Sequence, residues 1–322
     1  MSPRPSKDSV SGPHRVQLED VRQLNMVFAD SFTDRYRRDG MMGVRVPRLN
    51  PEIWRYAIRD AGAGAMLWRD QQGDIVAFNI AHHSGAEGWM GPLAVRPSRQ
   101  GSGIGTVIVD TAATWLRDQD VTTIGLETMP RTVDNIGFYS RLGFVPGHLT
   151  VTLTGESRAS DRRVGVRLSQ LSSSERDAMT LACRERLQCS APGYDFTREL
   201  ELTAELGVGD TVVIDDGNVR GFALWHSEAL VESRPAEDLR VLKIFADSGE
   251  TFDRLVTALE ACASQVGLGR LAIRCQTSSP AAYTSLIEAG YRVRWTDLRM
   301  TLGGFPEPAV GDSEILLSNW EI

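Results

Sequence analysis

The sequence lacks the features that would place it among secreted, metal-binding or membrane-spanning proteins. Its 322 residues include only 4 cysteines, and none of them forms a Cys-x-x-Cys pair. No apolar run approaches the ~20 residues that span a bilayer, and the Ser- and Pro-rich start of the chain has no apolar signal core. We therefore expect reduced thiols, a cytoplasmic location and no membrane partner.

A basic surface is missing as well. The 35 lysines and arginines are outnumbered by 42 aspartates and glutamates, giving a net charge of −7, and no block of the chain is rich in basic residues. This composition argues against a nucleic-acid partner. No His/Cys/Asp cluster has zinc-site spacing, and the adjacent His82 and His83 would point to opposite faces of a strand, so we predict no metal.

What the chain does contain is a glycine-rich turn, VRPSRQGSGIGT, at residues 95–106. Apolar residues recur at helical spacing after it, which predicts a helix from about Gly103 to Gln119. Glycines at alternate positions let backbone N–H groups converge on an anion at the positive end of that helix, so the turn predicts a phosphate or pyrophosphate ligand. A dinucleotide fingerprint would need a third glycine at position 106, where the chain has Thr106. A P-loop would need Gly-Lys-Ser/Thr, which is absent. Both motifs are therefore disfavoured.

The turn and the segments after it resemble a known family. Gln100, Gly103 and Gly105 form a Gln-x-x-Gly-x-Gly pattern similar to the coenzyme A pyrophosphate loop of the GCN5-related N-acetyltransferase (GNAT) superfamily. A strand is expected at residues 121–129 and a helix at 134–142. The stretch Tyr139-Ser140-Arg141-Leu142-Gly143-Phe144 resembles the Tyr-x-x-Leu-Gly-Phe with which family members close this helix. The resemblance covers residues 14–155.

The second half of the chain repeats this organisation at an offset of about 144 to 147 residues. We therefore expect a mixed α/β (α+β) protein with two tandem GNAT-like domains, each a central, mostly antiparallel mixed sheet with a splayed strand pair and flanking helices. The predicted parts are a disordered lead-in at 1–13, an active acetyltransferase domain at 14–155, a linker at 156–163 and a degenerate copy at 164–322.

The second copy differs where the chemistry would occur. Its counterpart of the glycine turn, around Asp247 and Glu250, has one glycine and two carboxylates, which would repel a pyrophosphate. Leu286 stands where the first copy has Tyr139. We therefore predict one coenzyme per chain, bound in the N-terminal half.

The resemblance implies a role for particular residues. The backbone of Leu93, Ala94 and Val95 would pair with the pantetheine arm, with the Val95 N–H as oxyanion donor. The pyrophosphate would lie in the loop formed by Gln100, Gly101, Ser102, Gly103, Ile104, Gly105 and Thr106. Asn135 would contact the coenzyme or cap its helix. Tyr139 would protonate the departing thiolate, a role that suits a phenol.

The general base is open among several residues. Glu87 lies near the start of the central strand, where some family members have a catalytic glutamate. His82 or His83 would titrate near neutrality, although His82 recurs as His226 in the second copy. Glu127 ends the following strand.

The function implied by the resemblance is transfer of an acetyl group from acetyl-CoA to a primary amine of a small molecule, by direct attack in a ternary complex. Two helices within about Glu19 to Asp60 would close over the acceptor, with Phe28, Phe32 and Tyr36 as an apolar wall. A second copy of the chain in a homodimer is compatible with this function. The alternatives are a non-catalytic acyl-CoA-binding sensor or regulatory module and an interaction scaffold.

Overall fold

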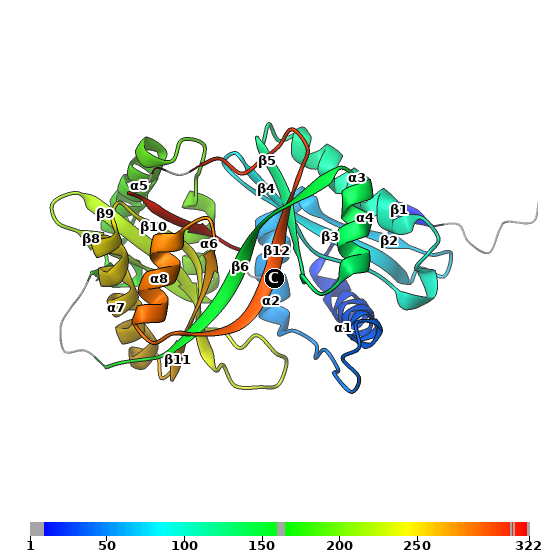
Figure 1. Cartoon of the computed structure of the whole chain (residues 1–322), viewed down its shortest axis with the longest axis horizontal. Helices are drawn as coiled ribbons and strands as arrows, with labels where there is room; N and C mark the ends of the chain where they lie inside the picture. The colour runs from blue at the N-terminus through cyan, green and yellow to red at the C-terminus, as the bar shows by residue number, and fades with distance from the viewer. Residues whose placement is uncertain (1–9, 160–164, 310, 312, 321–322) are drawn as a thin grey trace, which may run out of the picture.

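The chain folds into two lobes that repeat one order of helices and strands (Figure 1). The computed structural model describes residues 10–159, 165–309, 311 and 313–320. The N-terminal half contains β1 (Ser11–Arg15), α1 (Val21–Arg38), α2 (Pro51–Ala61), β2 (Ala65–Arg69), β3 (Ile75–Ser84), β4 (Glu87–Val95), α3 (Ile104–Arg117), β5 (Thr123–Thr128), α4 (Val133–Arg141) and β6 (Phe144–Glu156). The C-terminal half contains β7 (Val166–Arg167), α5 (Ser173–Ser190), α6 (Thr197–Leu206), β8 (Gly209–Asp215), β9 (Val219–His226), β10 (Asp238–Ala246), α7 (Gly249–Gln265), β11 (Arg270–Gln276), α8 (Pro280–Glu288), β12 (Arg292–Leu302) and β13 (Ile315–Ser318).

Local signals in the sequence explain where the helices begin. Pro51 occupies the first turn of α2, and the side chain of Asn50 accepts a hydrogen bond from the Glu52 backbone N–H. Ser172 and Glu175 form a reciprocal capping box at the start of α5. Helix α3 begins after Gly103, whose φ of 87° lies in the left-handed region.

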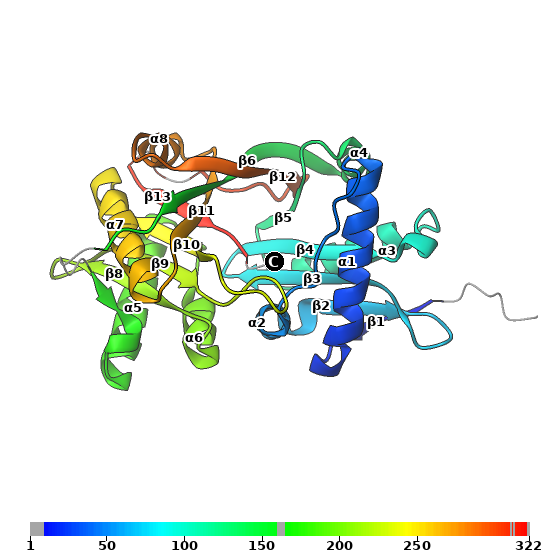
Figure 2. The same cartoon turned by 90° about the horizontal axis from the view of Figure 1, so that it is seen from below.

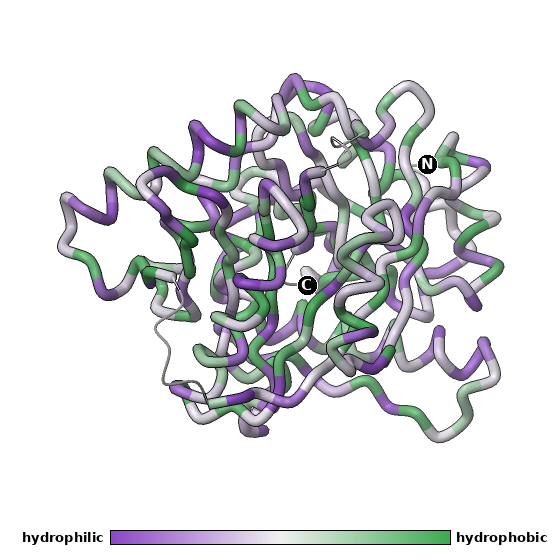
Figure 3. The backbone as a smooth tube through the Cα atoms, turned by 60° about the vertical axis from the view of Figure 1, so that its left-hand side comes forward, coloured by the Kyte–Doolittle hydropathy of each residue, from purple (hydrophilic) through white to green (hydrophobic). Residues whose placement is uncertain are grey.

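Helices cover both faces of the sheet in the N-terminal lobe. α3 and α4 bury their apolar residues against one face, and α1 and α2 bury theirs against the other. The hydropathy-coloured trace in Figure 3 shows hydrophobic segments gathered along the strands of the interior. Each lobe is therefore layered as helices, sheet and helices.

The two lobes share one continuous sheet. The strand order is β1-β2-β3-β4-β5-β12-β6-β11-β10-β9-β8-β7, and β13 pairs with β10. β6 comes from the N-terminal half, yet among the described residues it pairs with β11 and β12 of the C-terminal half. β12 in turn pairs with β5. The two halves thus exchange strands, and Figure 1 shows β6 and β12 crossing side by side between the lobes.

The predicted fold class and tandem organisation are confirmed by this architecture. The predicted helix at about 103–119 is observed at Ile104–Arg117 and the predicted strand at 121–129 is observed at Thr123–Thr128. The predicted lead-in at 1–13 is corrected at its end, because Ser11–Arg15 is a strand paired with β2, whereas residues 1–9 lie outside the described part. The linker predicted at 156–163 overlaps β6 by one residue, and its residues 160–163 lie outside the described part.

Strand exchange predicts that neither half folds independently. A fragment that ends at Ala159 leaves the backbone of β6 without its partners from the C-terminal half, and exposed strand edges promote aggregation. We expect this fragment to be insoluble when expressed alone and to form a 1:1 complex when co-expressed with a fragment that begins at Gly165. Size-exclusion chromatography and circular dichroism measure both outcomes, and a monomeric, cooperatively unfolding N-terminal fragment would contradict the expectation.

Candidate functional site

The strands β4 and β5 separate halfway along β4. They pair in parallel from Glu87↔Thr123 to Met90↔Leu126, and the pairing ends there although both strands continue. A register shift in the pairing of β3 with β4 lies at the same level, between Ala81↔Met90 and Asn79↔Leu93. The strands therefore splay at residues 91–92, as expected for this fold.

Beyond the splay, β4 has an open backbone edge. The Arg96 N–H donates to the Val76 carbonyl of β3 at 2.8 Å. Since alternate residues of an antiparallel strand face the same neighbour, Ala94 also directs its backbone groups toward β3, while Leu93 and Val95 direct theirs toward the splay. The open edge thus supports the predicted roles of Leu93 and Val95, but the alternation of the strand does not support that of Ala94.

The Val95 carbonyl is already engaged at this edge. It accepts hydrogen bonds from the Ser31 hydroxyl of α1 at 3.0 Å and from the side-chain amide of Gln100 at 3.1 Å. Gln100 therefore ties the glycine turn to the end of β4. The Val95 N–H and the Leu93 backbone groups are directed toward the splay and have no hydrogen-bond partner on that side among the described residues.

The glycine turn forms an open cradle at the start of α3. Gly101 and Gly103 have φ of 77° and 87°, and a Cβ at either would meet no atom within 4 Å. Ser102 fixes the turn by donating its hydroxyl to the Arg99 carbonyl at 2.7 Å. Exposed backbone, left-handed glycines and the first turn of a long helix are the features that suit a pyrophosphate.

The remaining predicted loop residues have mixed surroundings. Ile104 is buried in the core, so its backbone N–H is the group it can offer. A Cβ on Gly105 would approach Phe138 of α4 to 3.3 Å, which shows that this glycine also permits close packing of α3 and α4. Thr106 is half-buried in the first turn of α3. Asn135 lies in the first turn of α4 and donates to the Thr128 hydroxyl at 3.5 Å, at the end of β5.

Tyr139 is buried on α4 between two aromatic rings. Its ring centroid lies 5.2 Å from that of Phe138 and 6.1 Å from that of Phe144. Burial raises the pKa of Tyr139 well above its ordinary value, so the phenol is protonated at neutral pH. It is a proton donor in its resting form.

Glu87 is buried, and its carboxylate oxygens are both engaged. Oε1 accepts from the Trp89 indole at 3.2 Å and Oε2 from the Ser318 hydroxyl at 2.8 Å. Burial raises the pKa of Glu87, and the opposing effects of Lys243 and Ser318 are smaller. Glu87 pairs with the first residue of β5 and lies at the wall of a cavity of about 860 Å³ that does not contain the splay.

The splay opens into a different cavity, of about 490 Å³, between the two halves. Its wall includes Gly91 and Pro92 at the splay, Phe28 and Phe32 of α1, and His82 of β3. The C-terminal half contributes residues from the β9–β10 loop, β10, β11, β12 and the end of the chain, namely Leu230, Asp238, Arg240, Val241, Leu242, Arg270, Ala272, Arg274, Arg294, Trp295, Asp297, Arg299, Asn319 and Trp320. Phe28 and Phe32 thus form part of the wall, as expected, while Tyr36 packs on Trp295 with its ring centroid 6.3 Å away.

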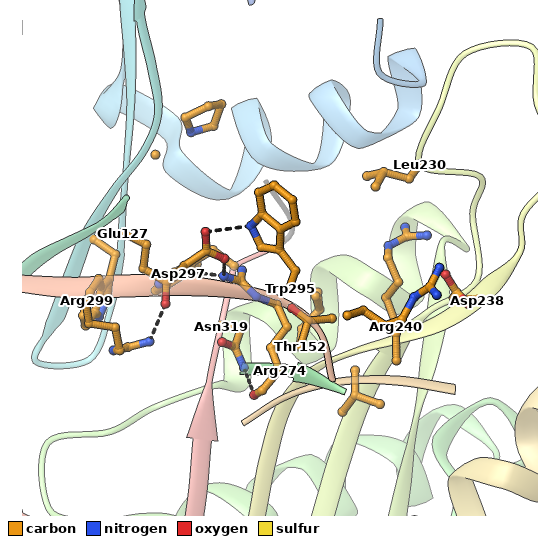
Figure 4. Close-up of a pocket in the computed structure, with 18 of the residues that line it drawn as sticks. Glu127, Thr152, Leu230, Asp238, Arg240, Arg274, Trp295, Asp297, Arg299 and Asn319 are labelled. Atoms are coloured by element: carbon orange, nitrogen blue, oxygen red, sulfur yellow. Dashed lines mark hydrogen bonds and ion pairs between the residues drawn. The ribbon is translucent and has the colours of Figure 1, made fainter. Parts of the chain in front are cut away.

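Glu127 lies in this cavity within a network of charges (Figure 4). It accepts hydrogen bonds from Arg274, from Arg299 at 2.9 Å and from Thr150 at 2.5 Å. Arg274 also donates to Asp297 at 3.0 Å. Burial by itself raises the pKa of Glu127, but the two guanidinium groups outweigh it and hold the pKa below its ordinary value. Glu127 is therefore an ionised anchor for the arginines.

The corresponding splay in the C-terminal half is filled. β10 pairs with β11 from Asp238↔Arg270 to Val241↔Ile273, and β13 then pairs with β10 from Lys243↔Ser318 to Ala246↔Ile315. Figure 2 shows β13 inside the C-terminal lobe. The chain's own strand thus occupies the edge that is open in β4.

The start of α7 is also closed to an anion. Asp247 accepts from the Thr251 hydroxyl at 2.7 Å and pairs with Arg220 at 2.7 Å, and Ser248 caps the helix by accepting from the Thr251 backbone N–H. A carboxylate of the protein therefore lies where the first half has its glycine cradle. Leu286 is fully buried in the apolar core.

Several wall residues of the cavity were missed by sequence reasoning. Arg274 is brought to the splay by β11, Arg299 by the exchanged β12, and Asn319 by the segment after β13. Their positions in the second repeat gave no signal, because the sequence does not reveal that strands are exchanged.

Two further findings concern the described part of the chain. Within it, no group of three or more His, Cys, Asp or Glu side chains could hold a metal ion. Over the same residues, no helix is both long enough and apolar enough to cross a membrane.

Comparison with known proteins agrees with this geometry. Residues 28–144 match the model of the acetyltransferase (GNAT) family. A search of curated proteins gave no match. A candidate acetyltransferase from Pyrococcus horikoshii has a similar structure, with a TM-score of 0.68, 17% identity, and coverage of 98% of this chain and 96% of that chain.

Two other solved structures have the same fold. N-myristoyltransferase from Saccharomyces cerevisiae, solved with myristoyl-CoA, gives a TM-score of 0.63 at 10% identity, covering 97% of this chain and 86% of that chain. A tandem GNAT protein from the clavulanic acid biosynthesis pathway gives a TM-score of 0.59 at 13% identity, covering 93% of this chain and 100% of that chain. At these identities the similarity establishes the fold.

The cradle predicts that Gly103→Ala weakens coenzyme A binding. The left-handed backbone costs an alanine roughly 1 kcal/mol, and its methyl group enters the space over the loop. We expect coenzyme A affinity to fall about tenfold or more by titration calorimetry, since ~1.4 kcal/mol corresponds to a factor of ten. Gly73→Ala is the matched control, because Gly73 has φ of 85° and equal free space in the β2–β3 hairpin. Equal loss of affinity in both variants would show that the cradle is not the binding site.

Proposed function

The chain carries a domain of the acetyltransferase (GNAT) family in residues 28–144, and on this basis we propose that it is an N-acetyltransferase that moves an acetyl group from acetyl-CoA to a primary amine of a small molecule. The observation that carries the proposal is the open edge of β4, which leads from the glycine cradle to a cavity between the halves. The pyrophosphate would lie in the cradle, the pantetheine arm along Leu93 and Val95, and the thioester at the splay.

The size of the cavity supports a small acceptor. About 490 Å³ lies within the range of small-molecule sites. Its wall combines aromatic rings with Glu127, Asp238 and Asp297 and with five arginines, Arg240, Arg270, Arg274, Arg294 and Arg299. Two of these arginines also pair with carboxylates outside the wall, Arg270 with Glu237 and Arg299 with Glu307, so the wall presents paired charges of both signs to a polar amine.

The N-terminal repeat is proposed as the active domain and the C-terminal repeat as a degenerate copy. In the C-terminal repeat, β13 fills the splay and Asp247 occupies the start of α7. This repeat therefore lacks both the open strand edge and the glycine cradle that would hold a coenzyme. It would instead supply the acceptor wall through β10, β11 and β12. The alternative is a non-catalytic acyl-CoA-binding module, in which the same N-terminal site would bind the coenzyme without turnover.

Turnover separates these two functions. We expect coenzyme A release from acetyl-CoA with at least one amine of a panel of the twenty amino acids, glucosamine, ethanolamine and spermidine. Tight coenzyme binding with no release on any amine would favour the binding module. Parallel reactions with myristoyl-CoA test the length of the acyl chain, because the yeast relative was solved with that coenzyme.

Tyr139→Phe tests the proposed general acid. Removing the hydroxyl from a protonated, buried phenol leaves the aromatic packing on Phe138 and Phe144 in place. We expect kcat to fall on the order of 10²-fold, as for loss of a general acid, with little change in the affinity for acetyl-CoA. Activity equal to that of the wild type would remove Tyr139 from the mechanism.

The stoichiometry of binding tests the asymmetry of the two halves. We expect titration calorimetry to give one coenzyme A per chain, because β13 fills the second splay. Two sites of similar affinity would show that β13 can be displaced and would contradict the assignment of the C-terminal half as degenerate.

A further inference from the structure

His82, in the wall of the splay cavity, forms a buried pair with Asp60 behind it. His82 of β3 places Nδ1 2.6 Å from Asp60 Oδ2 at the end of α2, and the two residues are 2% and 0% exposed. An ionised carboxylate only accepts hydrogen bonds, so Nδ1 carries the proton and Nε2 has the lone pair. Nε2 has no hydrogen-bond partner in the described part of the chain.

This unpartnered nitrogen belongs to a residue of the cavity wall. His82 lines the cavity together with Trp89, Gly91 and Pro92, and it lies opposite Trp89 in the pairing of β3 with β4. Trp320 stacks on the imidazole with a centroid separation of 4.9 Å and an interplanar angle of 17°. The ring is thus held from two directions, by Asp60 at one nitrogen and by Trp320 at its face.

From this arrangement we propose that His82 is the general base of the transfer and that Asp60 is its positioning residue. The proposal rests on the proposed function and deepens it. In the step, the lone pair of the amine attacks the thioester carbon, the C–N bond forms and the C–S bond breaks. The proton lost by the nitrogen goes to His82 Nε2. The sulfur leaves with a proton from Tyr139. The proton on His82 then returns through solvent to Tyr139, which restores both residues.

The other candidate bases are less suitable. Glu127 is held as an ionised anchor by Arg274 and Arg299, and those cations make it a weak base. Glu87 is hydrogen-bonded at both oxygens and does not line the cavity of the splay. His83 is on the opposite face of β3, edge-on to Trp115 of α3.

The second half contains a natural contrast. His226 occupies the same position of its hairpin but pairs with the neutral hydroxyl of Thr203, at 2.9 Å. It is fully buried and lines neither of the two cavities described above. His82 thus combines an aspartate partner with a place in a cavity wall, in the half whose β4 edge is open.

Charged groups from each neighbouring element surround the pair. Arg198 of α6 lies 3.8 Å from the second oxygen of Asp60, and Glu199 of the same helix is buried nearby. Lys243 of β10 lies 3.6 Å over the Trp320 ring, and His83 is adjacent on β3. Arg198 thus forms an ion pair at the oxygen of Asp60 that His82 does not contact.

His82→Gln in the full-length protein tests the base. With acetyl-CoA and the panel amine that the wild type turns over fastest, we expect kcat to fall about 10²-fold, while coenzyme A affinity by calorimetry stays within twofold. The acidic limb of the kcat/KM pH profile should disappear, and imidazole should restore part of the activity of His82→Ala. Asp60→Asn should lower kcat about tenfold or more, because the tautomer is no longer fixed. The KM for the amine should stay within twofold, because Asp60 does not line the cavity.

His226→Gln is the matched control, because it removes a buried histidine outside both cavities. It should lower the melting temperature and leave kcat within threefold of the wild type. A His82→Gln variant that keeps wild-type kcat, or keeps the acidic limb, overturns the assignment of the base alone. A wild-type protein that releases no coenzyme A with any panel amine overturns the proposed function, and the base with it.

Discussion

The exchange of β6 and β12 between the two halves is the constraint on which the rest of the structure depends. A strand in the interior must have hydrogen-bond partners on both sides, and β6 finds them only in β11 and β12 among the described strands. The exchange fuses two sheets into one and fixes the lobes relative to each other. A cavity between them can therefore have a defined wall, which a flexible pair of tandem domains could not provide.

The same exchange brings charges of the second half to the splay of the first. β12 lies beside β5, so Arg299 reaches Glu127, and its guanidinium lies 3.8 Å from the Trp89 ring. Arg299 is 3% exposed and is surrounded by carboxylates and an aromatic face, which is the arrangement that makes a buried guanidinium tolerable. The cavity wall at the splay is thus a product of the interface and not of either repeat by itself.

The two repeats use the same splay in opposite ways. In the first, the edge of β4 is open and the helix begins at exposed glycines. In the second, β13 pairs with the edge of β10, and the segment after β13 places Asn319 and Trp320 in the cavity of the first half. Filling the second splay removes an exposed edge in the interior and supplies part of the other site. The closure of the second splay and the completion of the cavity at the first are therefore linked through one short strand.

The sequence by itself determined the local structure and the glycine cradle. Apolar periodicity predicted α3 and β5 to within two residues at each end, and the glycines of the turn specified a left-handed backbone, because both signals are written in adjacent residues. The sequence left the general base open among Glu87, His82, His83 and Glu127. The tertiary structure decided the cavity wall at the first splay, the filling of the second splay by β13, and the pairing of His82 with Asp60. Each of these joins residues more than 20 positions apart in the chain, so the pairing of strands and helices fixes them and no local pattern records them.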